Sequence, residues 1–308
     1  MSSKPAMKVL VLHSLPPPDL VGRSPLEFDL ENAANHIAGA LPGSVTEGIC
    51  GEVDEITALL KTHRPDVIFN ACEAPLGRPD LESHFVALLE WVGVPFTGCG
   101  SETLALCRRK DRTKAVLAAA GVPVPRANVF PCVVKPIDAD GSAEIYFDSV
   151  CEDEEARSRA VARLHGAALV EEFVSGREFA VALWGCREPE HFSFTEICFH
   201  NGVRLLTYAA KWNEGSEEFV NTPYAYSTHI ETGTRDAIVA AAVGAWKAVD
   251  ARGYLTVDLR LDAAGNPFVL DVNPNSDLGP GAGIARAAEE VGWTWERFVR
   301  QQVEWARS

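Results

Sequence analysis

Two aspartates and an asparagine in the C-terminal third of the chain have the types and the spacing of a cation site. The chain around them alternates polar and apolar residues on both sides of Ala264 and Gly265, which predicts a β-hairpin. With the turn centred there, Asp258 lies directly opposite Asp271, and Asn273 shares their face. Facing side chains in such a pair have Cβ atoms about 4.5–5.5 Å apart. Two carboxylates and an amide oxygen therefore converge.

Facing carboxylates repel each other, so the pair needs a cation or a raised pKa. Hard oxygen ligands suit Mg²⁺, which proteins usually hold with one or two carboxylates together with substrate phosphates. A nucleotide site is therefore one interpretation, and a hairpin with a solvated polar face is the other. The opposite face is expected to be apolar and to carry Leu255, Val257, Leu259, Phe268, Leu270 and Val272.

Composition limits the classes of function. The chain has 308 residues, of which 47% are hydrophobic and 23% charged, enough for two or three subdomains. A net charge of -15 argues against a nucleic acid or an anionic membrane as the main partner. The eight cysteines form no C-x-x-C pair, and the first apolar run is too short for a signal or a membrane span. We therefore expect a cytoplasmic protein with reduced thiols.

Strand patterns alternate with helical patterns, which predicts an α/β protein with a parallel N-terminal sheet followed by α+β subdomains. Strands are expected over 7–13 and 66–70, with a helix over 30–41 between them. A basic helix is expected over 104–120, a strand over 204–209 and a loop over 212–228. An N-terminal substrate-side domain, a central subdomain and a C-terminal subdomain with the hairpin are expected at 1–98, 99–174 and 175–308.

The common phosphate-binding loops are absent, since there is no Walker sequence and 98–103 lacks the third glycine of the dinucleotide motif. Lys135 ends an apolar strand before a glycine-bearing loop, which places a positive charge and backbone N–H groups near a phosphate. A lysine that snorkels to the surface is the alternative. Residues 171–174 offer backbone groups for an adenine and Glu178 a carboxylate for a ribose, although solvated glutamates explain them equally well.

Taken in order, seven short stretches resemble the ATP-grasp superfamily, and most closely its D-alanine:D-alanine ligase branch. The resemblance covers nearly the whole chain. The matching stretches are 69–71, 93–98, 105–114, 133–136 with 141–142, 170–178, 208–211 and 257–273.

The resemblance implies an ATP-grasp fold, in which two α+β subdomains clasp ATP. It implies phosphate contacts from Lys110 and Lys135, a loop at Gly141 and Ser142 that closes over them, and a γ-phosphate contact from Lys211. The ligands of two Mg²⁺ ions, or of Mn²⁺ in their place, would be Asp258, Asp271 and Asn273. The other nucleotide contacts would come from Val133, Glu171, Glu172, Phe173, Val174, Glu178 and Leu270.

The chain departs from this family where the substrates would bind. The N-terminal loop that carries an amine-binding glutamate is replaced by residues 13–18. The family's histidine after Phe-Asn-Ala-x is Glu73, its oxyanion-stabilising arginine is Thr256, and its carboxylate-binding serine is Ala282. The ATP side keeps its pattern, so the resemblance implies an ATP and metal site with a different substrate pair.

Arg260 lies two residues after Asp258 on the polar face of the hairpin, whereas the family's arginine lies two residues before the aspartate. We expect Arg260 to take a catalytic role in place of the missing arginine, stabilising the acyl phosphate or the oxyanion. A structural salt bridge to Asp262 or Asp271 is the alternative.

The activity that the resemblance implies is ATP-dependent carboxylate–amine ligation through an acyl phosphate. The departures favour amino-acid or peptide substrates in specialised metabolism over cell-wall D-alanine ligation. A non-catalytic ATP-binding regulator is the alternative from another class. We expect small-molecule carboxylate and amine substrates, no nucleic-acid or membrane partner, and a homodimer by analogy with similar ligases.

Overall fold

The computed structural model describes residues 7–16, 26–226 and 229–308. Its first sheet is parallel, as predicted, with strand order β2-β1-β3. The first strand is an apolar run that is buried along its whole length, which suits a parallel sheet covered on both faces. The strands are β1 (Val9–Ser14), β2 (Val45–Ile49) and β3 (Val67–Ala71), and the helices are α1 (Leu26–Ala40), α2 (Val53–His63) and α3 (Glu82–Val92).

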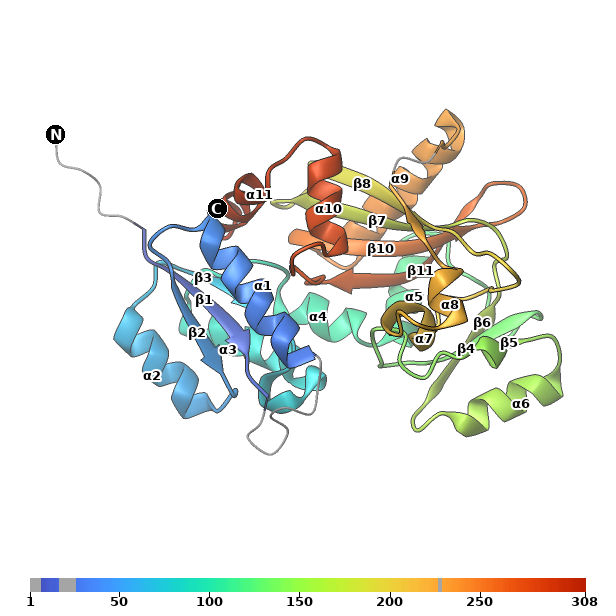
Figure 1. The fold of residues 1–308 in the computed structure, drawn as a ribbon, viewed down its shortest axis with the longest axis horizontal. Helices are drawn as coiled ribbons and strands as arrows, with labels where there is room; N and C mark the ends of the chain where they lie inside the picture. The colour runs from blue at the N-terminus through green and yellow to red at the C-terminus, as the bar shows by residue number, and fades with distance from the viewer. Residues whose placement is uncertain (1–6, 17–25, 227–228) are drawn as a thin grey trace.

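A small antiparallel sheet follows, with strand order β5-β4-β6. Helix α6 (Glu154–Arg163) packs on it, and the Asp153 carboxylate caps that helix by accepting a hydrogen bond from the Ala156 N–H at 2.9 Å. The strands are β4 (Cys132–Pro136), β5 (Val150–Cys151) and β6 (Ala168–Glu172). Figure 1 shows this unit in green at the end of the molecule opposite the blue N-terminal sheet.

The single basic helix expected over 104–120 is wrong, because the chain forms α4 (Ser101–Cys107) and α5 (Lys110–Ala119). The break falls at Arg109, whose φ of -99° and ψ of 87° are not helical. Beyond it, the Lys110 N–H donates to the Ile137 carbonyl at 2.8 Å rather than to a preceding turn. A tertiary hydrogen bond thus sets the start of α5 and fixes the position of Lys110.

The third sheet is antiparallel and has the strand order β11-β10-β7-β8-β9. Helix α9 (Thr232–Ala248) packs against it and buries Ile238, Ala242 and Trp246 in a shared core. The strands are β7 (Glu178–Gly185), β8 (His191–Ile197), β9 (Tyr224–Ala225), β10 (Gly253–Leu261) and β11 (Pro267–Pro274). One sheet falls in each of the ranges 1–98, 99–174 and 175–308.

The segment between β8 and α9 differs from expectation. The strand expected over 204–209 is wrong: the chain enters α7 (Tyr208–Trp212), capped by Thr207, whose Oγ1 accepts a hydrogen bond from the Ala210 N–H. The loop expected over 212–228 contains α8 (Glu217–Val220) and β9. Its last two residues lie outside the described part of the chain.

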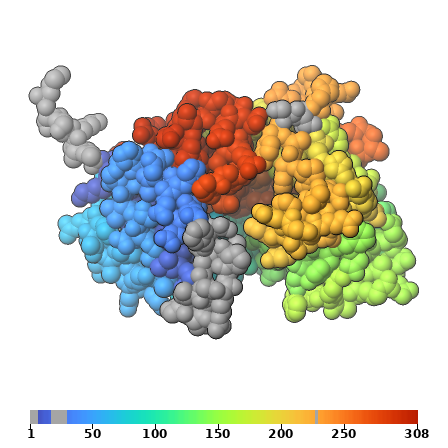
Figure 2. Space-filling view, viewed as in Figure 1, coloured from blue at the N-terminus to red at the C-terminus, as the bar shows by residue number. Residues whose placement is uncertain are grey.

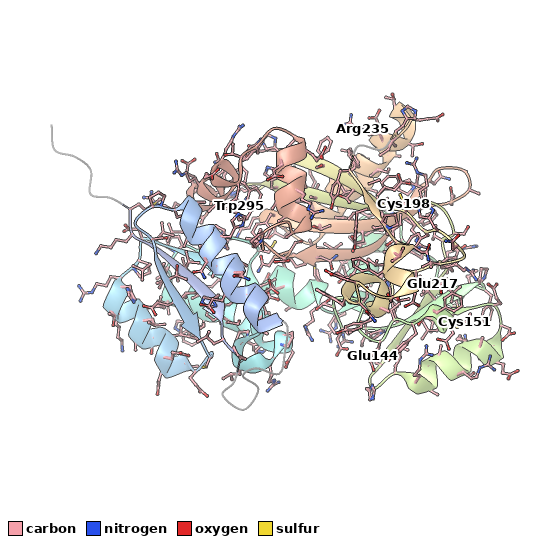
Figure 3. All side chains as sticks on the ribbon, in the orientation of Figure 1. Glu144, Cys151, Cys198, Glu217, Arg235 and Trp295 are labelled. Carbon is pink, nitrogen blue, oxygen red and sulfur yellow. The ribbon has the colours of Figure 1, made fainter. Side chains whose placement is uncertain are left out.

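The last two helices, α10 (Gly283–Glu290) and α11 (Trp295–Trp305), return to the N-terminal domain. One buried cluster joins Val9 and Ile37 of that domain to Phe298 and Val303 of α11. Trp295, labelled in Figure 3, stacks on His36 of α1 with ring centroids 4.5 Å apart. The first and last parts of the chain therefore share a core.

No helix in the described residues is long and apolar enough to cross a membrane.

Candidate nucleotide and metal site

The hairpin forms with the predicted pairing at its centre. Asp258 lies opposite Asp271, and Thr256 lies opposite Asn273. The turn contains Gly265, whose φ is +85°, a left-handed conformation that glycine adopts without strain. The Asp262 carboxylate accepts hydrogen bonds from the N–H groups of Ala264 and Asn266 and closes the turn.

A β-bulge after Asp258 changes the register on the turn side, where Leu259 pairs with Val269 instead of Leu270. The core residues of β11 are consequently Val269 and Val272. The expectation that Phe268 and Leu270 face the core is wrong, since both are half-buried and belong to none of the buried clusters. Two consecutive residues, Leu270 and Asp271, lie between the two core valines.

The two facing aspartates have opposite electrostatic environments. Burial raises the pKa of Asp258 to about 7, and the charges of Asp271 and Glu178 add to this rise. Burial acts in the same direction on Asp271, but the charges of Lys110 and Lys135 outweigh it and lower the pKa of Asp271. The Asn273 amide donates to Asp258 Oδ2 at 2.8 Å. Asp258 is therefore the carboxylate whose charge needs a further cation.

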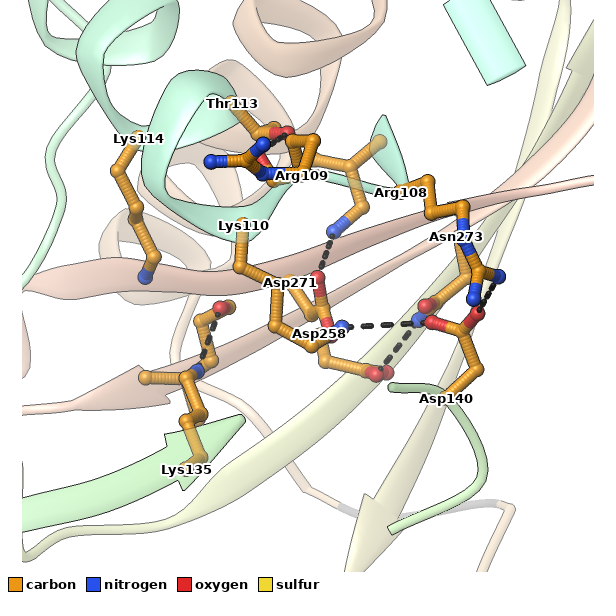
Figure 4. A network of polar contacts seen from close by, with 12 residues as sticks. Arg108, Arg109, Lys110, Thr113, Lys114, Lys135, Asp140, Asp258, Asp271 and Asn273 are labelled. Atoms are coloured by element: carbon orange, nitrogen blue, oxygen red, sulfur yellow. Dashed lines mark hydrogen bonds and ion pairs between the residues drawn. The ribbon is translucent and has the colours of Figure 1, made fainter. Parts of the chain in front are cut away.

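Lys110 comes from the start of α5 and is buried beside the hairpin (Figure 4). Its Nζ lies 2.5 Å from Asp271 Oδ2 and 3.4 Å from Asp140 Oδ1. Burial alone would lower the pKa of Lys110, but these two carboxylates raise it. The side chain is thus held charged next to the aspartate pair.

Two further lysines flank the buried carboxylate of Glu171. Lys114 Nζ lies 2.9 Å from Glu171 Oε2, and Lys135 Nζ lies 2.6 Å from Glu171 Oε1. Both ammonium groups also donate to backbone carbonyls of β11, Lys114 to Val269 at 2.6 Å and Lys135 to Leu270 at 3.1 Å. Burial raises the pKa of Glu171, but the two lysine charges reverse the shift and lower it.

Lys114 is the site residue that the sequence reasoning missed. It follows Lys110 by four residues, so both face the same side of α5, and that spacing was the available signal. Burial lowers the pKa of Lys114 to about 8; the Glu171 charge opposes this shift, and the Lys135 charge adds to it. Three lysines therefore gather beside the aspartate pair.

The stretch expected to hold adenine continues from β6 into the third subdomain. Phe173 and Val174 are buried, and Val133 of β4 pairs with Glu171. The Glu172 carboxylate, in contrast, forms a surface ion pair with Arg126 at 2.6 Å. The Phe173 N–H donates to the Pro131 carbonyl at 2.8 Å. The side chains of Phe173 and Val174 thus supply an apolar wall, while Glu171 forms ion pairs with Lys114 and Lys135.

The loop of Gly141 and Ser142 has left-handed backbone at both residues, with φ of +63° and +60°. Trp212, at the end of α7, donates from its indole Nε1 to the Gly141 carbonyl at 2.8 Å. Its neighbour Lys211 lies with its ammonium 5.3 Å from the Trp212 ring centroid. The charge of Lys211 acts on both Asp258 and Glu73, opposing the rise in their pKa. Lys211 therefore lies between the hairpin and the N-terminal domain.

Arg260 does not pair with Asp262 or Asp271, so the expected partners of the structural alternative are wrong. Its guanidinium is buried and forms an ion pair with Glu178, its neighbour across β7 and β10. It also donates to the carbonyls of Val174 at 3.1 Å and Arg204 at 2.6 Å. All three of its nitrogens have partners. These contacts favour a structural role, and the catalytic role stays a prediction that the geometry does not support.

The donor set fits a divalent cation. Asp258, Asp271 and Asn273 offer hard oxygen atoms on one face, and the raised pKa of Asp258 is the mark of a carboxylate whose charge is not fully balanced. Among the described residues no group of three or more histidines, cysteines or acids could hold a metal, so the asparagine and a phosphate would have to complete the set. The three lysines would face the phosphates.

Comparison with known proteins identifies the family to which the chain belongs. The family model described as "D-ala D-ala ligase C-terminus" matches residues 103–304. The chain belongs to the D-alanine:D-alanine ligase family. It is thus an ATP-grasp ligase that forms C–N bonds, from a family that depends on ATP and a divalent metal.

Two relatives and one solved structure illustrate the similarity. A D-alanine–D-alanine ligase of Desulforudis audaxviator is 30% identical over 79% of this chain and 81% of its own length. An uncharacterized protein of Sinorhizobium fredii is 29% identical over 86% and 84%. The ATP complex of a D-alanine–D-alanine ligase from Bacillus anthracis has a TM-score of 0.73, with 16% identity over 98% of this chain and 97% of that chain, and supports the ATP-grasp fold.

The surface is hollowed between the N-terminal domain and the segment around α7 and α8 (Figure 2). Thr256 Oγ1 is hydrogen-bonded to Ser276 Oγ at 2.9 Å, and Ala282 caps α10 without a side-chain hydrogen bond. Glu73 follows β3 and faces the charge of Lys211. Residues 17–18 of the replaced N-terminal loop lie outside the described chain.

Proposed function

We propose that this protein joins a small-molecule carboxylate to an amine in an ATP-dependent reaction that passes through an acyl phosphate, and that its substrates are amino acids or peptides of specialised metabolism. The observation that supports this most directly is the contrast between the two halves of the cleft. Lys110, Lys135 and the facing Asp258 and Asp271 keep the ATP-side pattern. Glu73, in contrast, stands where the resemblance implies a histidine.

In the first step, an oxygen of the substrate carboxylate attacks the γ-phosphorus of ATP, and the bond from that phosphorus to the ADP oxygen breaks. Negative charge on the transferring group must be stabilised during this step. Lys110 is already charged and buried beside the hairpin, and Lys135 on β4 donates a hydrogen bond to the Leu270 carbonyl of the hairpin. Magnesium ions held by Asp258, Asp271 and Asn273 would neutralise phosphate charge when bound. No nucleophilic side chain is needed.

In the second step, the amine nitrogen attacks the acyl carbon, phosphate leaves with the bridging oxygen, and the amine loses a proton. Water must be kept out, because it would hydrolyse the acyl phosphate. The contact between Trp212 and the Gly141 carbonyl joins the α7 segment to the loop expected to cover the phosphates. Lys211 on the same helix would then reach the γ-phosphate.

D-Alanine–D-alanine ligation is the second candidate, because the relatives in Desulforudis audaxviator and Bacillus anthracis carry that name. Incubation with ATP, Mg²⁺ and pooled L- and D-amino acids and dipeptides separates the readings. ADP release with a new ligated mass other than D-alanyl-D-alanine supports our proposal, and that dipeptide alone supports the second candidate. ATP binding without ADP release in any mixture would support a non-catalytic regulator instead.

A further inference from the structure

Helix α10 lies on the same face of the third sheet as the two aspartates. Asp258 pairs with Ala180 of β7, and Ala182, two residues further along β7, shares that face. Ala182 belongs to the buried cluster that contains Ile284 and Ala285 of α10, whereas the odd-numbered residues of β7 pack with α9 on the opposite face. In Figure 2 the red C-terminal segment borders the hollow, across from the orange α7–α8 segment. Helix α10 is therefore part of the wall of the cleft that holds the aspartates.

Arg286, in the first half of α10, extends back toward the start of that helix. Its guanidinium lies so close to Gly281 that a Cβ atom at that glycine would be 3.3 Å from Nη2 and 3.7 Å from Nε. From Nη1 the guanidinium donates to the hydroxyl of Tyr226 at 2.8 Å, and its carbon lies 5.5 Å from the centroid of the tyrosine ring. Arg286 is thus held beside the first turn of α10, although the residue is exposed.

These contacts leave the charge of Arg286 without a counter-ion. The Tyr226 hydroxyl is a neutral acceptor, and no ion pair within the described part of the chain includes this arginine. Ala282, which precedes α10, makes no side-chain hydrogen bond. A guanidinium has five N–H donors in a planar fork that matches a carboxylate, and the hydrogen bonds among the described residues use one nitrogen of this fork. Arg286 therefore offers two donors to an anion.

The segment that carries Tyr226 connects Arg286 with the metal site. Strand β9 lies at the edge of the third sheet, where Tyr224 pairs with Ile197 of β8. Burial raises the pKa of Tyr224 to about 12, and the charge of Asp258 adds to this rise. The same segment thus lies near the aspartates at Tyr224 and contacts Arg286 at Tyr226, two residues later.

We propose that Arg286 binds the carboxylate of the amine substrate and thereby selects an acceptor that is itself an amino acid or a peptide with a free C-terminus. The proposal rests on the ligase function proposed above and names a specificity residue for one of its two substrates. The donor carboxylate must meet the phosphate beside Lys110 and the aspartates, so a carboxylate at Arg286 belongs to the other substrate. It would accept charge-assisted hydrogen bonds from two nitrogens of the fork, while Tyr226 positions the guanidinium.

Mass spectrometry of the products tests the proposal with ATP, Mg²⁺ and a pool of L- and D-amino acids, to which the same amino acids are added as carboxamides. The free acids can act as donors and both forms as acceptors, so each acceptor side chain gives a product with a terminal carboxylate and one with a terminal amide. We expect the carboxylate products to exceed the amides at least about tenfold, the size of a charge-assisted hydrogen-bonded pair. A wild-type ratio near one would overturn the proposal.

Variants of the two residues connect this ratio to the guanidinium. Arg286→Met removes the charge and keeps a long side chain that favours helices, so the melting temperature and KM for ATP should stay unchanged while the ratio falls toward one. Arg286→Lys should keep only part of the ratio, because an ammonium group lacks the planar fork. Tyr226→Phe should lower it by less than Arg286→Met. An unchanged ratio in Arg286→Met would contradict the assignment, even if that variant changes which donor is used.

Arg297→Met is the matched control. Arg297 is also exposed, lies 3.9 Å from the centroid of the Trp293 ring and forms no ion pair among the described residues, but it is on α11. This variant should keep the full ratio. A similar loss in Arg297→Met would assign the preference to the overall charge of the protein and reject the role of Arg286.

The outcome for the ligase function is read separately, from ADP release. ADP release and ligated products with the same ratio in wild type and Arg286→Met would reject the carboxylate contact and keep the ligase. Absence of ADP release with every mixture would reject the ligase. Calorimetric titration of the protein with ADP and Mg²⁺ would then decide the contact: tighter binding of the free amino acids than of their carboxamides, lost in Arg286→Met, would support it, and equal binding would reject it.

Discussion

Asp258 carries most of the electrostatic cost of placing two carboxylates opposite each other. Lys110 lies 2.5 Å from Asp271 and compensates that side chain, whereas Asp258 accepts a hydrogen bond from the neutral Asn273 amide. The pKa of Asp258 is consequently raised to about 7, while that of Asp271 is lowered. A cation bound by the pair would remove that cost.

Asp258→Asn should therefore remove function and raise the stability of the metal-free protein. Between pH 4 and 7 the native protein keeps a proton on Asp258 that the unfolded chain releases, so the contribution of Asp258 to stability falls as pH rises through this window. We expect the variant to melt above the wild type at pH 8 and to approach it at pH 5.5, both without Mg²⁺. ADP formation should fall at least about a hundredfold. Equal melting temperatures of the variant and the wild type at pH 8 would show that the ionised Asp258 carboxylate does not destabilise the metal-free protein.

Lys114→Met tests the lysine that the sequence reasoning missed. Because burial lowers the pKa of Lys114 to about 8, the side chain loses its charge as pH rises from 7 to 9. We expect wild-type ATP affinity to weaken over this range and the variant to bind about tenfold more weakly at pH 7 with a flatter pH profile. Calorimetry at both pH values measures this. Parallel profiles for the two proteins would remove Lys114 from the phosphate site.

At the scale of elements, closure of the cleft depends on α7. Trp212→Phe keeps an aromatic ring against Gly141 and removes the 2.8 Å hydrogen bond from Nε1. One neutral hydrogen bond contributes about 1 kcal/mol, so KM for ATP should rise about fivefold, and more ADP should appear without ligated product. The matched control is Trp91→Phe on α3, where the tryptophan is 90% exposed. Unchanged coupling of ADP to product in Trp212→Phe would exclude this helix from closure.

The hairpin shows what its sequence could and could not predict. Alternation and Gly265 predict the turn and the pairing of Asp258 with Asp271. The bulge was not predictable, since Phe268, Val269 and Leu270 are apolar in succession and fit either phase of the strand. The sequence also offered no indication of contacts between residues that are distant in the chain.

Pairing between Arg260 and Glu178 requires β7 and β10 to be neighbours in the sheet. No local sequence pattern indicates which strands are neighbours. The break before Lys110 likewise depends on the carbonyl of Ile137, which is distant in sequence. Sequence reasoning therefore found residue types and local faces, and it failed where tertiary contacts decide the conformation.

At the scale of the whole molecule, the core that joins the two ends of the chain predicts cooperative unfolding. Phe298 is fully buried against Trp184 and Tyr254, in a cluster that includes strands of the N-terminal sheet. Phe298→Ala should lower the free energy of unfolding by about 3–5 kcal/mol. We expect one transition in calorimetry for both proteins. A separate early transition of the N-terminal domain would contradict the shared core.

The bulge in β11 also has a consequence for chain length. Val269 and Val272 face the core, so removal of Leu270 alone would leave a strand that alternates regularly, with Asp271 still opposite Asp258. A homologue one residue shorter at this point could thus keep its cation ligands and its fold. It would lose the carbonyl to which Lys135 donates. Deletion of Leu270 would thus change the nucleotide half of the cleft, whereas deletion of Val272 would move Asn273 to the face that packs against the core.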